Sequence, residues 1–93
     1  MIRSYRDGLT ERIARGETPK GFPADLVRRA VRKLTILENA KTLDDLRSPP
    51  GNNLEALKGN RKGQHSIRLN DQFRICFVWS DAGPEQVEIT DYH

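Results

Sequence analysis

Apolar residues in the N-terminal part of the chain recur at spacings of three and four, the repeat of an amphipathic helix. The pattern predicts a helix over about Pro23 to Ala40. Its single apolar stripe consists of Val27, Ala30, Val31, Leu34 and Leu37. Proline suits the start of a helix, and Asp25 would lie in the first turn, where the helix dipole favours a negative charge.

Weaker patterns flank this helix. A shorter helix is expected from about Asp7 to Gly16, because two apolar residues lie four apart and the glycine can end the helix. Residues 2–5 alternate ahead of it and predict a short first strand. After the long helix, Thr42 and Asp45 have the spacing of a capping box and predict a further helical turn.

The segment Ser48-Pro49-Pro50-Gly51-Asn52 breaks the helical pattern and separates a helical half from a strand half. Short apolar segments follow, separated by turns rich in Gly, Asn and Asp. The expected strands are residues 54–58, 65–69, 73–79 and 86–92. Short strands joined by short turns predict an antiparallel meander.

Side-chain alternation assigns the two faces of this sheet. The face toward the helices should carry Ile67, Leu69, Phe73, Ile75, Phe77 and Trp79. The opposite face, expected to be half open, should carry Ser66, Arg68, Arg74, Cys76 and Val78. His65 is expected on the same face of the strand as Ile67, which favours a structural role. The pattern predicts one α+β domain over residues 1–93, with N-terminal helices packed on one face of a mostly antiparallel β-sheet.

Composition narrows the possible functions. Hydrophobic residues make up 35% and charged residues 31% of the chain, which is typical of a compact soluble domain. No apolar run approaches the roughly 20 residues of a membrane span, and the N-terminus lacks the apolar core of a signal peptide. The single cysteine, Cys76, excludes an internal disulfide, and two distant histidines argue against zinc. We expect a cytoplasmic protein without cofactor, metal or membrane partner.

The net charge of +3 is unevenly distributed. Residues 1–35 carry nine Lys or Arg against four Asp or Glu, whereas residues 36–93 carry seven against nine. The basic residues Arg28, Arg29, Arg32 and Lys33 point away from the apolar stripe of the long helix. Such a face could contact an acidic protein or a nucleic-acid backbone, although a solvated charged face is the commoner case.

Residues suited to proton transfer and anion binding gather on the open face and at the C-terminal end of the sheet. They are Glu55, Lys58, Arg61, Lys62, Arg68, Arg74, Asp91, Tyr92 and His93. Cleavage of an RNA phosphodiester needs a base for the 2′-OH proton, an acid for the 5′-oxygen and cations around the phosphorane, but no metal. The residue types fit this reaction, yet each is individually common, and a solubilising Asp-Tyr-His tail is the simpler explanation of the last three.

Four segments together give a more specific signal through a family resemblance. They are Leu46-Arg47-Ser48-Pro49-Pro50-Gly51-Asn52, Leu54-Glu55-Ala56-Leu57-Lys58-Gly59-Asn60-Arg61, Ser66-Ile67-Arg68-Leu69-Asn70-Asp71-Gln72-Phe73-Arg74-Ile75-Cys76-Phe77 and Val87-Glu88-Ile89-Thr90-Asp91-Tyr92-His93. Over essentially the whole chain they resemble the HigB toxins of the RelE/ParE superfamily, type II toxin–antitoxin proteins, and most closely the GraT-like members.

The resemblance implies a RelE-like fold and a ribosome-dependent endonuclease that cuts mRNA in the A site and so inhibits translation and growth. It also implies a HigA-type antitoxin with a helix-turn-helix domain, through which the complex binds operator DNA. By position, Lys58, Arg74 and the segment Asp91-Tyr92-His93 match the family's active site. Some members have a histidine where this chain has Glu55, so Glu55 could act as a base or only orient Lys58.

The roles expected from this resemblance are hypotheses. His93 would be the general acid or base, and Arg74 and Lys58 would contact the scissile phosphate. Tyr92 would stack on or hydrogen-bond a base or ribose, and Asp91 would orient its neighbours or contact a base edge. The residues expected to hold ribosomal or messenger RNA are Arg61, Lys62 and Arg68. Because Asp91 and His93 alternate with core positions, they reach an open site only if the strand end projects beyond the core.

Two alternatives remain at this point. The first is a ParE-like toxin that inhibits DNA gyrase by binding, which would not need His93, Lys58 or Arg74. The second is a protein-interaction module that uses the basic helix. The helix could equally be where an antitoxin docks, so it does not distinguish the alternatives.

Overall fold

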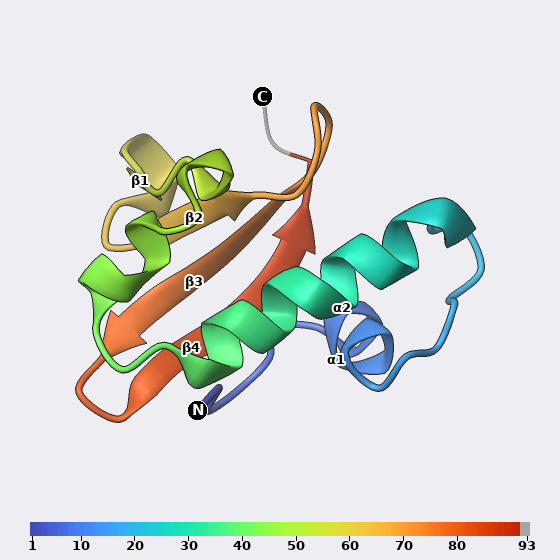
Figure 1. Ribbon diagram of the computed structural model, residues 1–93, viewed down its shortest axis with the longest axis horizontal. Helices are drawn as coiled ribbons and strands as arrows, with labels where there is room; N and C mark the ends of the chain where they lie inside the picture. Colours follow the sequence, from blue (N-terminus) through green and yellow to red (C-terminus); the bar gives the residue numbers. More distant parts are fainter. Residues whose placement is uncertain (92–93) are drawn as a thin grey trace.

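A computed structural model of the chain describes residues 1–91 and confirms the α+β fold. Two α-helices pack with a four-stranded antiparallel sheet whose strands follow chain order, and α2 lies across this sheet with α1 beside it (Figure 1). The helices and strands are α1 (Gly8–Ala14), α2 (Ala24–Asn39), β1 (Glu55–Ala56), β2 (His65–Arg68), β3 (Arg74–Ser80) and β4 (Gly83–Thr90). Three 3-10 helices lie between α2 and β2: η1 (Leu43–Arg47), η2 (Pro50–Asn52) and η3 (Gly59–Arg61).

Both predicted helices are present, and α1 begins at a side-chain cap. The Thr10 amide donates to the Asp7 carboxylate at 2.9 Å and starts α1. The apolar stripe of α2 is buried, apart from the half-buried Val31. The predicted capping box is confirmed, because Thr42 and Asp45 each accept a backbone hydrogen bond from the other at the start of η1.

The strands match the expected meander in order but not at every end. The predicted strand over residues 54–58 is reduced to the two residues of β1. The β3–β4 turn is shorter than expected, so β4 begins at Gly83 and Pro84 pairs with Trp79 inside the ladder. Residues 2–5 form one parallel bridge, Tyr5 with Val87, and backbone hydrogen bonds of 2.7–3.1 Å tie residues 3–6 to β4. The N-terminal segment therefore extends the sheet beyond β4.

The core lies between the helices and one face of the sheet, as predicted. Phe77, Ile75 and Ile67 are completely buried there, but Trp79 is only half-buried and lies at the margin of the core. A hydrogen bond of 2.9 Å from the Ile89 amide to the buried Thr10 hydroxyl joins β4 to α1.

The opposite sheet face, called here the second face, corrects one expectation. Ser66 and Cys76 have no exposed surface, so this face is closed over its centre, whereas Arg68, Arg74 and Val78 are partly exposed. The partly buried charged side chains of Arg61, Arg74 and Glu88 lie on this side, close enough to act on the Cys76 thiol. The alternation of side chains along the strands could not predict the burial of Ser66 and Cys76, because long side chains cover small neighbours regardless of their charge.

Gly83, the first residue of β4, occupies a position that other residues cannot take without strain. Its φ is +124°, and a Cβ there would lie 2.3 Å from the Met1 carbonyl oxygen. We expect Gly83→Ala to lower the free energy of unfolding by about 1–3 kcal/mol, measured by urea denaturation. The control is Gly51→Ala, because Gly51 has no heavy atom within 4 Å of such a Cβ and no positive φ. Equal stability of the two variants would contradict the prediction.

Candidate active site on the second sheet face

The strand register aligns side chains in two neighbouring rows across the second face. The first row is Glu55, Ser66, Cys76 and Glu88. The second row is Arg68, Arg74 and Thr90. Residues two apart on a strand share a face, so the two rows lie side by side. The sheet thereby gathers polar and charged side chains from all four strands into one candidate site.

Arg74, at the start of β3, is held in one orientation by the chain around it. Its Nε donates to the Ser66 hydroxyl at 2.7 Å, and its Nη2 donates to the Asn53 carbonyl at 2.6 Å. The side chain is only 18% exposed. Within residues 1–91, its Nη1 donates no hydrogen bond. One amino group of a fixed guanidinium is therefore available to an anion.

Glu55 is the acid next to this guanidinium. Its Oε2 lies 4.0 Å from Arg74 Nη2, and its side chain is 57% exposed. An exposed ion pair at this distance contributes little to stability, so Glu55 is free to exchange Arg74 for another partner. Within residues 1–91 it forms no ion pair with Lys58. The structure thus brings Glu55 to Arg74 and gives no support for the role of orienting Lys58. The other role, that of a base, stays a proposal.

Arg61 is engaged inside the protein. Its Nη1 donates to Glu88 Oε1 at 3.0 Å and to Gln64 Oε1 at 3.2 Å, and Arg6 approaches the other Glu88 oxygen at 3.8 Å. Lys62, by contrast, is exposed at the end of η3. Arg61 therefore orders this side of the sheet, and Lys62 is the more accessible of the two.

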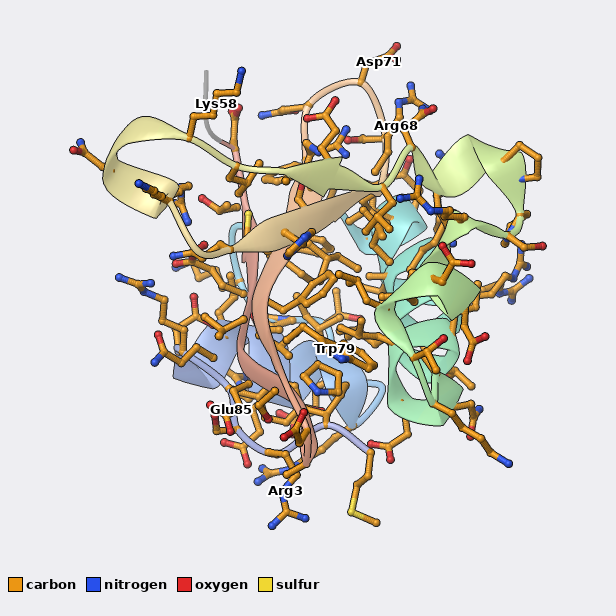
Figure 2. The ribbon with its side chains drawn as sticks, turned by 90° about the vertical axis from the view of Figure 1, so that its left-hand side faces the viewer. Arg3, Lys58, Arg68, Asp71, Trp79 and Glu85 are labelled. Atoms are coloured by element: carbon orange, nitrogen blue, oxygen red, sulfur yellow. The ribbon has the colours of Figure 1, made fainter. Side chains whose placement is uncertain are left out.

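Lys58 and Arg68 lie at one end of the molecule, opposite the end that carries Arg3 and Glu85 (Figure 2). Lys58 is exposed where η3 begins. Arg68 ends β2 and its guanidinium donates to the exposed Asp71 carboxylate in the next turn. Figure 2 places Lys58 and Arg68 on opposite sides of this end, and the register pairs Arg68 with Arg74.

Asp91 is the last residue that the structure describes. It follows Thr90, which pairs with Arg74, and its carboxylate accepts a hydrogen bond of 3.2 Å from the Gln72 side chain. This places Asp91 at the Arg74 end of the site. The predicted catalytic residues Tyr92 and His93 lie outside the described residues, and their roles stay proposals from the sequence.

Cys76 lies under the site and, as expected, has the character of a structural residue. It is completely buried, and burial raises the pKa of its thiol to about 11. At pH 8 only about one thiol in a thousand is then ionised. We expect Ellman's reagent at pH 8 to label the folded protein at least about a hundredfold more slowly than the urea-unfolded protein. Rapid labelling of the folded protein would show that the thiol is accessible and activated.

His65 also has the structural position expected of it. Its ring packs against Phe77 on the core side of the sheet, with ring centroids 6.3 Å apart and planes inclined by 23°. Its Nδ1 is buried and has no hydrogen-bond partner within residues 1–91. This nitrogen is therefore enclosed and cannot reach a substrate, which agrees with a structural role for His65.

The basic face of α2 is a second charged surface. Arg28, Arg29 and Arg32 are exposed and form no ion pair within residues 1–91, whereas most other arginines there pair with a carboxylate. Burial lowers the pKa of Lys33, and the positive charges of Arg29, Arg68 and Arg32 lower it further. The face thus reaches from α2 toward Arg68 at the end of β2.

The described residues contain no cluster of three or more His, Cys, Asp or Glu side chains that could hold a metal ion. Among residues 1–91, no helix combines the length and apolar character that crossing a membrane requires.

Comparison with known proteins decides the family. Residues 3–93 match the family model described as the RelE-like toxin of the type II toxin–antitoxin system HigB. The chain belongs to this HigB-like toxin family. It is 49% identical over 61 residues to Toxin HigB-1 of Vibrio cholerae serotype O1, a match that covers 66% of this chain and 64% of that toxin. An uncharacterized protein of Haemophilus influenzae is 33% identical over 78 residues, which cover 83% of this chain and 77% of that protein.

A solved structure supports the fold of this HigB-like toxin. The YoeB-YefM complex from Staphylococcus aureus contains a chain that superposes with a TM-score of 0.63, at 15% sequence identity. The superposition covers 100% of the present chain and 98% of the other. At this identity the likeness concerns the fold alone.

Sequence reasoning missed two groups that hold the site of this toxin together. The Ser66 hydroxyl and the Asn53 carbonyl are the hydrogen-bond acceptors that fix Arg74. The cross-strand register of β2 and β3 could have indicated Ser66. Nothing in the local sequence indicates Asn53, because it makes the contact through its backbone carbonyl. The preceding residues 48–52 indicate only a break in the helical pattern.

Proposed function

We propose that this HigB-like toxin is a ribosome-dependent endoribonuclease that cleaves mRNA in the A site and thereby inhibits translation. The observation that carries the proposal is the orientation of Arg74, whose anchored guanidinium leaves Nη1 available beside an exposed carboxylate. Such a preorganised cation stabilises the negative charge that develops on a phosphorane. Family membership supports the same conclusion.

The site residues have different roles in the proposed reaction. His93 exchanges a proton with the 2′-oxygen or the 5′-oxygen, and Glu55 or Tyr92 is the candidate for the second proton transfer. Arg74 and Lys58 neutralise the phosphate, while Asp91 orients its neighbours. The residues proposed to hold RNA are Lys62 and Arg68 directly, with Arg61 supplying positive potential.

We further propose that a HigA-type helix-turn-helix antitoxin binds this toxin and that the complex, not the toxin alone, binds operator DNA. The unpaired arginines of α2 suit a carboxylate-rich segment of such a partner. Replacing Arg28 and Arg29 with glutamate would then weaken antitoxin binding.

The proposed function is tested with purified toxin, programmed ribosomes and mapping of the 5′ ends of the mRNA. We expect cleavage at the A-site codon, no cleavage of the same mRNA without ribosomes, and a strong reduction in His93→Ala. Growth arrest without cleavage would overturn the nuclease and direct attention to DNA gyrase. Equal cleavage by wild type and His93→Ala would keep the nuclease and assign the proton transfer to Glu55, Tyr92 or Lys58.

A further inference from the structure

The loop between η1 and β1 supplies the carbonyl that orients Arg74. Arg74 Nη2 donates to Asn53 at 2.6 Å, the shorter of its two backbone contacts, since the Ser66 carbonyl lies 3.4 Å away. Asn53 has a left-handed conformation, with φ of 44° and ψ of 58°, directly after η2. The direction of its carbonyl therefore depends on how firmly the preceding residues are fixed.

Asn52 fixes those residues. It is completely buried, and its amide donates to the carbonyls of Leu46 at 3.1 Å and Ser48 at 3.2 Å. These two hydrogen bonds tie η2 to η1 and the segment that follows it. A buried amide that satisfies two backbone carbonyls is costly to replace, because either carbonyl would then be left unpaired.

Lys33 of α2 completes the arrangement. Its Nζ donates to the remaining group of the Asn52 side chain, Oδ1, at 2.5 Å. Lys33 holds this position beside Arg29, Arg32 and Arg68, whose charges disfavour its protonated form. A charge-assisted hydrogen bond to a buried amide offsets part of that repulsion. A continuous path thus runs from α2 through Lys33, Asn52 and Asn53 to the guanidinium of Arg74.

We propose that Lys33 and Asn52 are positioning residues that set the orientation of Arg74 through the Asn53 carbonyl. Asn52 is completely buried and Lys33 donates to it, so both act through Arg74 in this proposal. The consequence for catalysis rests on the proposed nuclease function, whereas the consequence for the Arg74 geometry does not. A displacement of about 1 Å in a catalytic group can cost about a hundredfold in rate, so the effect on cleavage is measurable.

The test uses Lys33→Met, which keeps the length of the side chain but removes its charge and hydrogen bonds. Lys33→Arg is the conservative variant, and Lys20→Met is the matched control because Lys20 is exposed in the loop before α2. The first measurement is the Arg74 Nε–H signal in ¹H–¹⁵N spectra, identified by its loss in Arg74→Lys. We expect Lys33→Met to shift this signal and speed its hydrogen exchange about tenfold, Lys33→Arg to restore it largely, and Lys20→Met to leave it unchanged.

The second measurement is single-turnover cleavage on programmed ribosomes. Lys33→Met should lower the rate constant about tenfold to a hundredfold with ribosome affinity unchanged, and it should have no further effect in an Arg74→Ala background. An unchanged Arg74 signal, or additive losses in the double variant, would overturn the proposal. If the wild-type toxin cleaves nothing, the nuclease function fails while the spectra still decide the positioning. Asn52→Asp provides a second variant, in which the amide donors to both the Leu46 and the Ser48 carbonyl are lost.

Discussion

Replacing Arg74 with alanine is expected to lower the single-turnover rate of mRNA cleavage by about a hundredfold to a thousandfold. The guanidinium is anchored on its Nε and Nη2 by Ser66 and Asn53, so Nη1 is already oriented before substrate arrives. A preorganised donor of this kind contributes more in the transition state than in the ground state. The rate constant should therefore fall much more than the affinity for the ribosome.

Arg74→Lys separates charge from geometry. Lysine keeps the positive charge, but it cannot hold Ser66 and Asn53 while presenting a further amino group to phosphate. We expect Arg74→Lys to cleave at less than about a tenth of the wild-type rate, so that its barrier stays at least about 1.4 kcal/mol above that of the wild type. The control is Arg12→Ala, because Arg12 lies on α1 and, within residues 1–91, pairs only with the exposed Glu17. Full activity of Arg74→Ala would remove this residue from the chemistry and point to a toxin that acts by binding.

The elements that could be predicted from the sequence are those whose local signals agree with their tertiary contacts. The apolar stripe of α2 has a clear helical period and is buried against the sheet, so both bounds of the helix are placed within one residue. The capping box at Thr42 and Asp45 depends on residues three apart and is equally local. The strand order follows from short turns that leave neighbouring strands little choice of partner.

The parts that could not be predicted depend on contacts between distant residues. Asn52 reads as a turn residue after Pro-Gly, yet it is buried between η1 and α2 because Lys33 and two carbonyls satisfy its amide. The closure of the second face over Cys76 depends on how the side chains of Arg61 and Glu88 fold over it. Neither periodicity nor residue type encodes such packing.

The candidate site also combines features that the sequence predicts with features that depend on contacts between distant residues. The sequence pattern selected Glu55 and Arg74 as candidates, and the strand register brings them within 4.0 Å of each other. It also selected Arg61, which the fold uses in an internal ion pair with Glu88. The choice of residue types was thus possible from the sequence, whereas their division into substrate-facing and structural groups depends on how the whole sheet is packed.

The largest effect on stability is expected for Phe77→Ala. Phe77 is completely buried in the middle of β3 and packs against His65, so alanine leaves a cavity that the rigid sheet cannot fill. We expect the free energy of unfolding to fall by about 3–5 kcal/mol. That is a large share of the total for a domain of this size, about 5–14 kcal/mol by the usual scaling with length. Urea denaturation followed by circular dichroism measures the loss.

The comparison with Trp79→Ala makes this prediction specific to the structure. From the sequence alone the two aromatic residues share one parity, and the larger tryptophan should lose more on truncation. In the structure Trp79 is half-buried at the core margin, so its truncation leaves a notch that water fills instead of an enclosed cavity. We therefore expect Phe77→Ala to destabilise the protein by more than Trp79→Ala, despite the smaller ring. The reverse order would mean that the core centres on the β3–β4 turn and not on the middle of β3.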